Sequence, residues 1–395
     1  MKGQKAPVRA AIVGWAHTRF GRLTDATVES LAVTAARDAL AHAGIDPRDI
    51  DEILLGHYNG GLSRQDFTAA LALGAHPALR FKPATRVENA CASGAAAVHQ
   101  GIRAIEARRA RIVLVVGVEK MTDSSSREIG EYLLRAAYIA EESAAGGFAA
   151  LFGQVADRYF ARYGDQSDAL ALIAAKNHAN GCHNPLAQIR KDLGYDFCRT
   201  VSDQNPLVTG PLKRTDCSPV SDGAAALLIA SVDAAVTAPR AVGFRGIGHA
   251  QEIMPMSQRD IVQLDGCRIA WAKALGEAGL SLANLSFAET HDCFTIAELI
   301  EYEAMGLVPE GQGARAISEG WTMLDGKLPI NTSGGLKAKG HPIGATGVSM
   351  HAFAAMQLCN QAPAGIQVRH PTIGGVFNMG GVGVANYVSI LERVR

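Results

Sequence analysis

No run of apolar residues in this 395-residue chain approaches the roughly 20 that a membrane-spanning helix needs, although 48% of the residues are hydrophobic. Basic and acidic residues balance at 38 each, so the chain lacks the excess positive charge of a nucleic-acid-binding protein. The first residues do not form a secretory signal, and the last match no anchor or address motif. These absences predict a soluble cytoplasmic protein that binds neither nucleic acid nor membrane.

The cysteines lack the pattern of a disulfide framework. They are odd in number and scattered, at Cys91, Cys182, Cys198, Cys217, Cys267, Cys293 and Cys359. Such thiols suit a reducing compartment. No paired CxxC or HxxH spacing is present, and Cys182, His183 and Cys198 are too irregular to form a zinc site. We therefore expect no bound metal.

Strand-like apolar runs alternate with alanine-rich helical stretches. Strands are predicted at residues 8–15, 111–119, 223–231 and 238–244. A helix is predicted over residues 28–44, ending at Gly44. This alternation predicts an α/β architecture in which helices cover a sheet.

The second half of the chain echoes the first. Residues 39–53 align with 274–288, and residues 91–98 align with 341–348, in the same order. The second alignment places Cys91 on His341. Similarity at this spacing suggests two copies of one α/β unit.

The alternation of predicted strands and helices is interrupted between the two copies. Loop-like runs such as TDSSS, SAAGG and NPLVTGP interrupt it. We predict an N-terminal half at residues 1–119, completed by about 216–239, an inserted loop domain at 120–215, and a C-terminal half at 240–395. Long insertions on a rigid scaffold often cover binding sites.

Cys91 lies in the run ENACASGAAA, residues 88–97, among almost uniformly small neighbours. A strand-like stretch precedes it and a helix is predicted to follow as far as about Arg108. The sulfur would then lie at a helix N-terminus, which favours a thiolate. We interpret the alanines as clearing a path for a substrate, with a buried structural cysteine as the alternative.

Three further stretches carry candidate reactive groups. In ETHDCF, His291 and Cys293 follow a predicted strand where a helix begins, a setting that suits proton transfer at carbon. Five glycines around His341 allow close backbone approach to a ligand, without the Walker or dinucleotide spacing. The N–H groups of Gly380 and Gly381 suit either an oxyanion site or an ordinary glycine-rich hairpin.

In this order the motifs resemble the thiolase superfamily, across about residues 8–392. HDCF and the segment LKRTDCSPVSDGAAAL resemble the branch of sterol-carrier-protein-like thiolases and acetyl-CoA acetyltransferases. The resemblance implies two βαβαβαββ halves in a five-layered αβαβα arrangement with an inserted loop domain. It also implies a homodimer or a dimer of dimers.

The resemblance assigns roles to individual residues. Cys91 would carry the acyl group and His341 would activate it. Asn378 stands where most thiolases have a second cysteine, so the resemblance assigns transfer of the α-carbon proton to Cys293. His291 replaces an asparagine that elsewhere orders an oxyanion-hole water.

A second oxyanion hole would consist of the backbone N–H groups of Cys91 and Gly380. Coenzyme A (CoA) would act as co-substrate with an acyl-CoA or 3-ketoacyl-CoA, and no cofactor would be tightly bound. Lys213 and Arg214 are candidates to meet CoA phosphates, although solvated charges explain them equally well.

The expected activity is a thiolase that cleaves a 3-ketoacyl-CoA with CoA, or runs the reverse Claisen condensation, through an acyl-cysteine. Three alternatives stay open. One is a condensing synthase that uses a cysteine and two histidines. Another is a lyase or acyltransferase acting with a small OB-fold partner. The third is a silent scaffold or acyl carrier.

Overall fold

The computed structural model describes residues 8–395. A nine-stranded sheet with the order β3-β2-β4-β7-β1-β8-β11-β10-β9 runs through it. Its strands are β1 (Ala10–His17), β2 (Glu52–Gly56), β3 (Ala84–Val87), β4 (Ile112–Glu119), β7 (Gly223–Ser231), β8 (Val242–Gln251), β9 (Phe287–Glu289), β10 (Ile373–Gly380) and β11 (Ala385–Arg393). A separate hairpin consists of β5 (Leu207–Thr209) and β6 (Leu212–Lys213).

Helices cover this sheet and form the insertion. They are α1 (Val28–Ala43), α2 (Thr68–Leu71), α3 (Ser93–Glu106), α4 (Ser126–Leu134), α5 (Ile139–Glu142), α6 (Phe148–Tyr163), α7 (Ser167–His183), α8 (Gly194–Arg199), α9 (Val232–Ala235), α10 (Asp265–Ala278), α11 (Thr295–Ala304), α12 (Gly313–Ser318) and α13 (Ile343–Leu358). None of the helices in residues 8–395 is long and apolar enough to cross a membrane.

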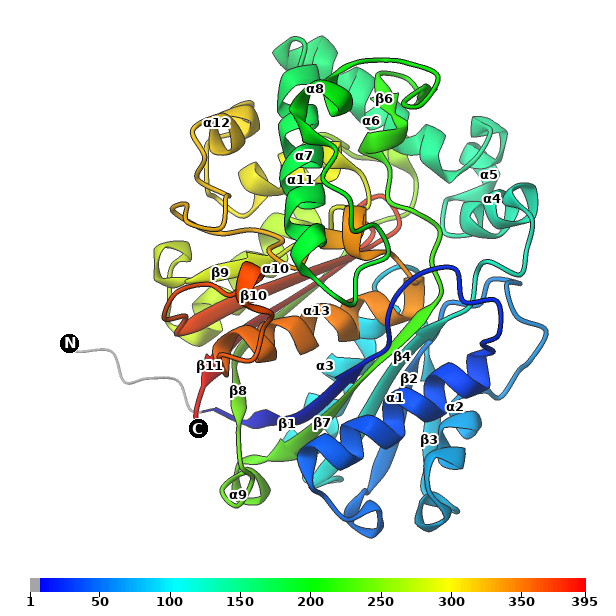
Figure 1. Cartoon of the computed structure of the whole chain (residues 1–395), viewed down its shortest axis with the longest axis vertical. Helices are drawn as coiled ribbons and strands as arrows, with labels where there is room; N and C mark the ends of the chain where they lie inside the picture. Colours follow the sequence, from blue (N-terminus) through cyan, green and yellow to red (C-terminus); the bar gives the residue numbers. More distant parts are fainter. Residues whose placement is uncertain (1–7) are drawn as a thin grey trace.

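The sheet halves enclose a central helix layer. The halves join edge to edge where β1 pairs with β8, at Ala11–Gly243 and Ile12–Val242. Helices α3 and α13 pack between the halves, while α1 covers the outer face of one and α10 the outer face of the other (Figure 1). This arrangement confirms the five-layered αβαβα fold expected from the sequence.

The internal repeat is visible in local geometry. Helices α1 and α10 end at Gly44 and Gly279, whose φ angles of 67° and 65° are left-handed and suit glycine. Each glycine is followed by a 3₁₀ turn and then a strand, β2 or β9. These two strands run parallel to β4 and β10 respectively. The two copies predicted from the sequence are therefore confirmed.

The small residues after Cys91 serve helix packing. A Cβ atom on Gly94 would lie 2.8 Å from the carbonyl oxygen of Gly344, and one on Gly347 would lie 2.2 Å from the backbone nitrogen of Ala95. Helices α3 and α13 thus touch backbone to backbone. The interpretation that the alanines clear a path for a substrate is wrong, because Ala95, like its neighbours in α3, is fully buried in this contact.

The insertion between β4 and β7 is more helical than the sequence suggested. Helices α6 and α7 are 16 and 17 residues long. Helix α6 buries apolar residues at helical spacing, from Leu151 to Tyr159. These helices lie beside α11 and α12 in the upper part of Figure 1. The strand predicted at residues 238–244 begins later, at Val242. The domain boundaries given above stay a prediction.

Candidate active site

Three of the predicted residues meet at one point. Side-chain ligand atoms of Cys91, His291 and His341 all lie within 4.8 Å of one another, and all three residues are buried. The two imidazole rings stand edge to face, with centroids 5.2 Å apart. Cys91 precedes α3 and His341 precedes α13, so the repeat itself brings these two residues face to face. The expectation that no metal binds here stays a prediction.

His341 is held in one tautomer. Its Nδ1 lies 2.7 Å from the hydroxyl of Thr346, and that hydroxyl donates to the carbonyl of Pro342. The Thr346 oxygen must therefore accept a hydrogen bond from Nδ1–H, which leaves a lone pair on Nε2. Nε2 has no hydrogen-bond partner among the described residues. Burial, aided by nearby Lys339, lowers the pKa of His341 to about 3, so the ring is neutral.

Asn378 connects the nucleophile to the second histidine. Its amide nitrogen donates to the carbonyl of Cys91 at 3.1 Å and contacts Nδ1 of His291 at 2.9 Å. Because the Cys91 carbonyl only accepts, the NH₂ group must face it, and Nδ1 of His291 then accepts the second hydrogen. Burial lowers the pKa of His291 well below its usual value. The neutral ring therefore carries its proton on Nε2, as a donor.

The Cys91 thiol is protonated in the resting site. Burial raises its pKa to about 12, although hydrogen bonds from the backbone of Gly381 and of Cys91 itself oppose this rise. The expectation that a helix N-terminus would favour the thiolate is therefore wrong, because desolvation outweighs it. A base must remove the proton as the sulfur attacks.

The glycine pair after β10 packs against the Cys91 loop. A Cβ atom on Gly380 would lie 2.4 Å from the carbonyl oxygen of Asn89, so a side chain there would displace the loop. Gly381 has a φ of 63°, and its backbone hydrogen-bonds to Cys91. Gly380 therefore lets the strand approach the nucleophile, and Gly381 is the glycine whose backbone reaches it.

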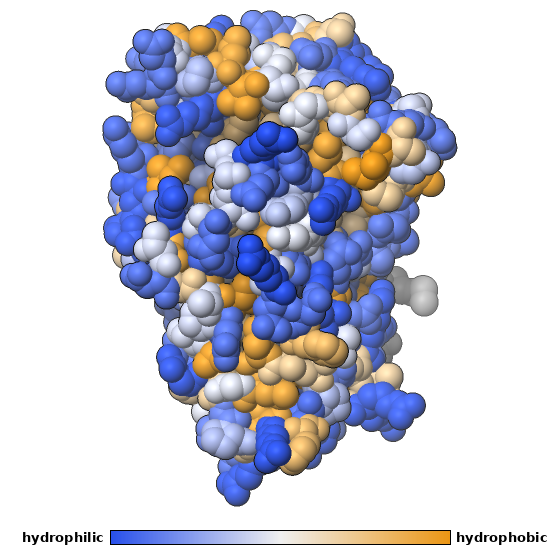
Figure 2. All heavy atoms as spheres, turned by 90° about the vertical axis from the view of Figure 1, so that its right-hand side faces the viewer, coloured by the Kyte–Doolittle hydropathy of each residue, from blue (hydrophilic) through white to orange (hydrophobic). Residues whose placement is uncertain are grey.

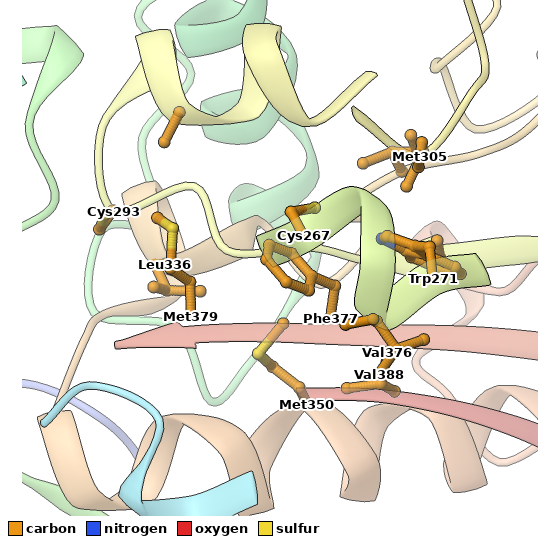
Figure 3. Close-up of a cluster of buried hydrophobic side chains, with 14 of the residues drawn as sticks. Cys267, Trp271, Cys293, Met305, Leu336, Met350, Val376, Phe377, Met379 and Val388 are labelled. Atoms are coloured by element: carbon orange, nitrogen blue, oxygen red, sulfur yellow. The ribbon is translucent and has the colours of Figure 1, made fainter. Parts of the chain in front are cut away.

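Cys293 is buried beside the nucleophile. Its carbonyl accepts from the Ser218 backbone N–H at 2.9 Å, and Cys217 forms a β-bridge with Phe294. Figure 3 shows Cys293 at one end of a hydrophobic cluster, near Leu336 and Met379. Burial is the main cause that raises the thiol pKa of Cys293 well above its usual value, and the Cys91 sulfur adds to it.

One cavity of about 170 Å³ opens onto these groups. Its lining is mainly apolar and comes from both halves and the insertion: Tyr58, Cys91, Met121, Leu133, Ala136, Phe148, Ala149, Val208, Cys217, Ser218, Pro219, Val220, Cys293, Phe294, His341 and Ile343. Cys217, which is not one of the predicted catalytic residues, therefore lines the same cavity as Cys91, Cys293 and His341. The inserted region does cover the site, as long insertions often do.

Lys213 and Arg214, the two residues predicted to contact CoA phosphates, lie in different surroundings. Lys213 is buried and forms an ion pair with Asp216 at 3.0 Å, so its charge is already matched inside the protein. The expectation that Lys213 meets a CoA phosphate is therefore not supported. Arg214 is exposed and lines a different pocket from the one at Cys91.

Two residues that support the site, Glu119 and Thr346, are not evident from the sequence. Glu119, at the end of β4, accepts from the backbone N–H groups of Tyr58, Asn59 and Gly344 at 2.9–3.1 Å, and so ties the start of α13 to the sheet. Its position as a lone carboxylate at the end of an apolar strand was the feature of the sequence that could have indicated this role. Thr346 lies in the GHPIGATG motif, but the sequence alone does not show that it faces the histidine.

Comparison with known proteins places the whole chain in one family. The thiolase N-terminal domain matches residues 10–193, and the thiolase C-terminal domain-like family matches residues 248–393. The acetyl-CoA acetyltransferase of Methanothermobacter thermautotrophicus is 34% identical over 387 residues, which cover 97% of this chain and 99% of that protein. Human sterol carrier protein 2 is 31% identical over 384 residues, covering 90% of this chain and 66% of that protein.

A solved structure shares the fold throughout. An Ltp2–ChsH2 (DUF35) aldolase superposes with a TM-score of 0.83 at 22% identity, covering 99% of this chain and all of that one. At this identity the likeness concerns the fold alone.

Proposed function

Because the chain belongs to the thiolase superfamily, we propose that it is a CoA-dependent acyltransferase that cleaves a 3-ketoacyl-CoA with CoA, or runs the reverse Claisen condensation. The observation that carries this proposal is the pair of thiols, Cys91 and Cys293, lining one apolar cavity with His341. One thiol holds the acyl group while the other moves a proton at carbon. The similarity to an acetyl-CoA acetyltransferase over nearly the full length supports it.

The first half-reaction begins at Cys91. Nε2 of His341 accepts the thiol proton while the sulfur attacks the 3-keto carbon. The resulting oxyanion accepts from backbone N–H groups at Cys91 and the Gly380–Gly381 turn, where each donor is worth about 3 kcal/mol. Collapse of this intermediate breaks the bond between C2 and C3. The acyl group stays on Cys91, and the electron pair moves to C2.

The second thiol completes each half-reaction. Cys293 gives its proton to C2, which releases acetyl-CoA, while Nε2–H of His291 donates to the thioester oxygen of the transient enolate. An incoming CoA then gives its thiol proton to the Cys293 thiolate, and its sulfur takes the acyl group. His341 returns its proton to Cys91, which restores the starting state.

A homodimer is part of this proposal. Strand β3 is one of the two edge strands of the sheet, and its outer side pairs with no other strand in residues 8–395. Near it, Phe67 and Phe81 expose 88% and 84% of their surface. Figure 2 shows hydrophobic residues gathered low on the face where α2 and β3 lie in Figure 1. An unpaired edge flanked by exposed aromatic side chains favours pairing with a second copy.

A cytoplasmic location is also part of the proposal, because a reducing compartment suits both CoA chemistry and free thiols.

A condensing synthase is the second candidate. The observation that favours it is the close grouping of Cys91, His291 and His341, because a cysteine and two histidines are the residues such an enzyme needs. The two candidates differ in what they require of Cys293. A synthase keeps its condensing activity in Cys293→Ala, whereas a thiolase loses it.

The test is a steady-state assay of 3-ketoacyl-CoA consumption, with free CoA, over a panel of acyl chain lengths. We expect Cys91→Ala and Cys293→Ala each to lower kcat by about 10³-fold or more, since each removes a group that reacts directly. Cys182→Ser, at a cysteine outside the cavity, is the matched control and keeps its activity. Full activity of Cys91→Ala would reject the proposal.

A further inference from the structure

A second, basic pocket lies apart from the catalytic cavity. It has a volume of about 390 Å³ and is lined by His178, Ile189, Lys191, Leu193, Phe197, Gln204, Arg214, Thr215 and Lys337. These residues come from α7, α8, the segments around them and the π-helical turn Gly335–Lys339 that precedes His341. None of them lines the cavity at Cys91. In Figure 1, α7 and α8 lie above the sheet, on the side of the insertion.

The charges in the basic pocket have one sign. Lys191, Arg214 and Lys337 line it, and no carboxylate does. Lys337 is only 3% exposed, and its backbone N–H, rather than its ammonium, is the group that donates to Asp292. Asp216 and Asp292 lie close enough to stabilise its charge, but Asp216 pairs with Lys213 and Asp292 accepts from backbone N–H groups. Burial is nevertheless the main influence on Lys337 and lowers its pKa, so an anion in the pocket would stabilise the ammonium further.

His178 adds an unsatisfied polar group to the same wall. It is 1% exposed and lies close to the backbone of Lys191, yet neither ring nitrogen completes a hydrogen bond with the described residues. Burial and the charge of Lys337 lower its pKa to about 3, so the ring is neutral and offers one N–H donor. Buried polar groups in native proteins almost always have partners, so an acceptor atom of a ligand in the pocket would satisfy this N–H.

We propose that the basic pocket binds the phosphate group of a small molecule. Three cations without a carboxylate suit a dianion better than the single charge of a carboxylate, and a phosphate has enough oxygens for all of them. The volume exceeds that of a bare phosphate. Ile189, Leu193 and Phe197 provide an apolar wall for the rest of the ligand. The phosphate belongs either to a separate phosphate ester or to CoA itself.

The test measures binding, without turnover, so it stands whether or not the thiolase proposal does. Inorganic phosphate and phenyl phosphate are titrated calorimetrically into the full-length protein. We expect saturable binding, about tenfold weaker in Lys337→Met, which removes the buried charge but keeps the side-chain bulk. Lys82→Met, at an exposed lysine near the 3₁₀ turn that precedes β2, is the matched control and binds like the parent.

Arg214→Met provides a second variant in case Lys337→Met does not fold, and it should also weaken binding. Competition then identifies the source of the phosphate. If CoA displaces phenyl phosphate and pantetheine does not, the site holds a CoA phosphate; if neither displaces it, the ligand is a separate phosphate ester. Absence of saturable binding of either phosphate, or unchanged affinity in both variants, overturns the proposal.

Discussion

The hydroxyl of Thr346 lies 2.7 Å from Nδ1 of His341 and determines which ring nitrogen is free to act on Cys91. Thr346 is the seventh residue of the GHPIGATG motif, five residues after His341, and its hydroxyl is oriented by a hydrogen bond to the carbonyl of Pro342. The base therefore depends on a neighbour that never touches the substrate.

Replacing Thr346 tests this dependence. Thr346→Val keeps the volume but leaves Nδ1–H without an acceptor, a loss worth about 1–3 kcal/mol. We expect kcat to fall about tenfold to a hundredfold, with little change in KM. Thr346→Ser keeps the hydroxyl and should restore most of the rate. Equal rates for the valine and serine variants would show that the contact is not needed.

Gly94 should be essential for the contact between α3 and α13. In Gly94→Ala the new methyl would lie 2.8 Å from the Gly344 oxygen and from the Val348 nitrogen, both backbone atoms that cannot turn away. We expect a loss of about 1–3 kcal/mol in unfolding free energy, measured by urea denaturation. Gly276→Ala, in helix α10 with nothing within 4 Å, is the control, and helix propensity should make it neutral or stabilising.

The alkylation rate of Cys91 should rise with pH without levelling off. The raised pKa of about 12 means that the thiolate fraction still grows tenfold per pH unit at pH 10. Iodoacetamide labelling of Cys91, followed by peptide mass spectrometry from pH 6 to 10, measures it. The same thiol in urea-unfolded protein should level off above its ordinary pKa of about 8.5. A plateau in the folded protein below pH 8 would instead reveal a stable thiolate–imidazolium pair.

Chelation should leave the enzyme active. Cys91, His291 and His341 are close enough to hold a divalent cation, but the acyl group requires the Cys91 sulfur to be free. We expect EDTA treatment to leave kcat unchanged and added Zn²⁺ to inhibit by occupying the sulfur. Loss of activity on chelation, restored by a metal, would make this a metal centre.

Much of the fold could be read from the sequence because its signals are local. The glycine that ends α1, the buried strand β4 and the echo between the halves each follow from composition and spacing within short segments. The convergence of Cys91 and His341 followed from the same echo, since equivalent positions of two copies meet at the α3–α13 contact.

The parts that could not be read depend on contacts between distant segments. The sequence of the alanines after Cys91 is compatible both with a substrate path and with close helix packing. Only the position of α13 shows that they pack against a helix. The protonation of Cys91 depends on burial rather than on its place before a helix. Lys213 and Lys337 look like ordinary charges in the sequence, yet one is paired inside the protein and the other lines the basic pocket.

The most direct test of the central claim is peptide mass spectrometry after incubation with a panel of 3-ketoacyl-CoA and acyl-CoA esters. The parent enzyme, incubated with an acyl-CoA while the released CoA is removed, should accumulate the intermediate, because no acceptor thiol is then left to take the acyl group. We predict an acyl adduct on Cys91 alone, lost from the parent enzyme when free CoA is added. An adduct on another residue, or none from any ester on folded protein, would contradict the acyl-Cys91 mechanism.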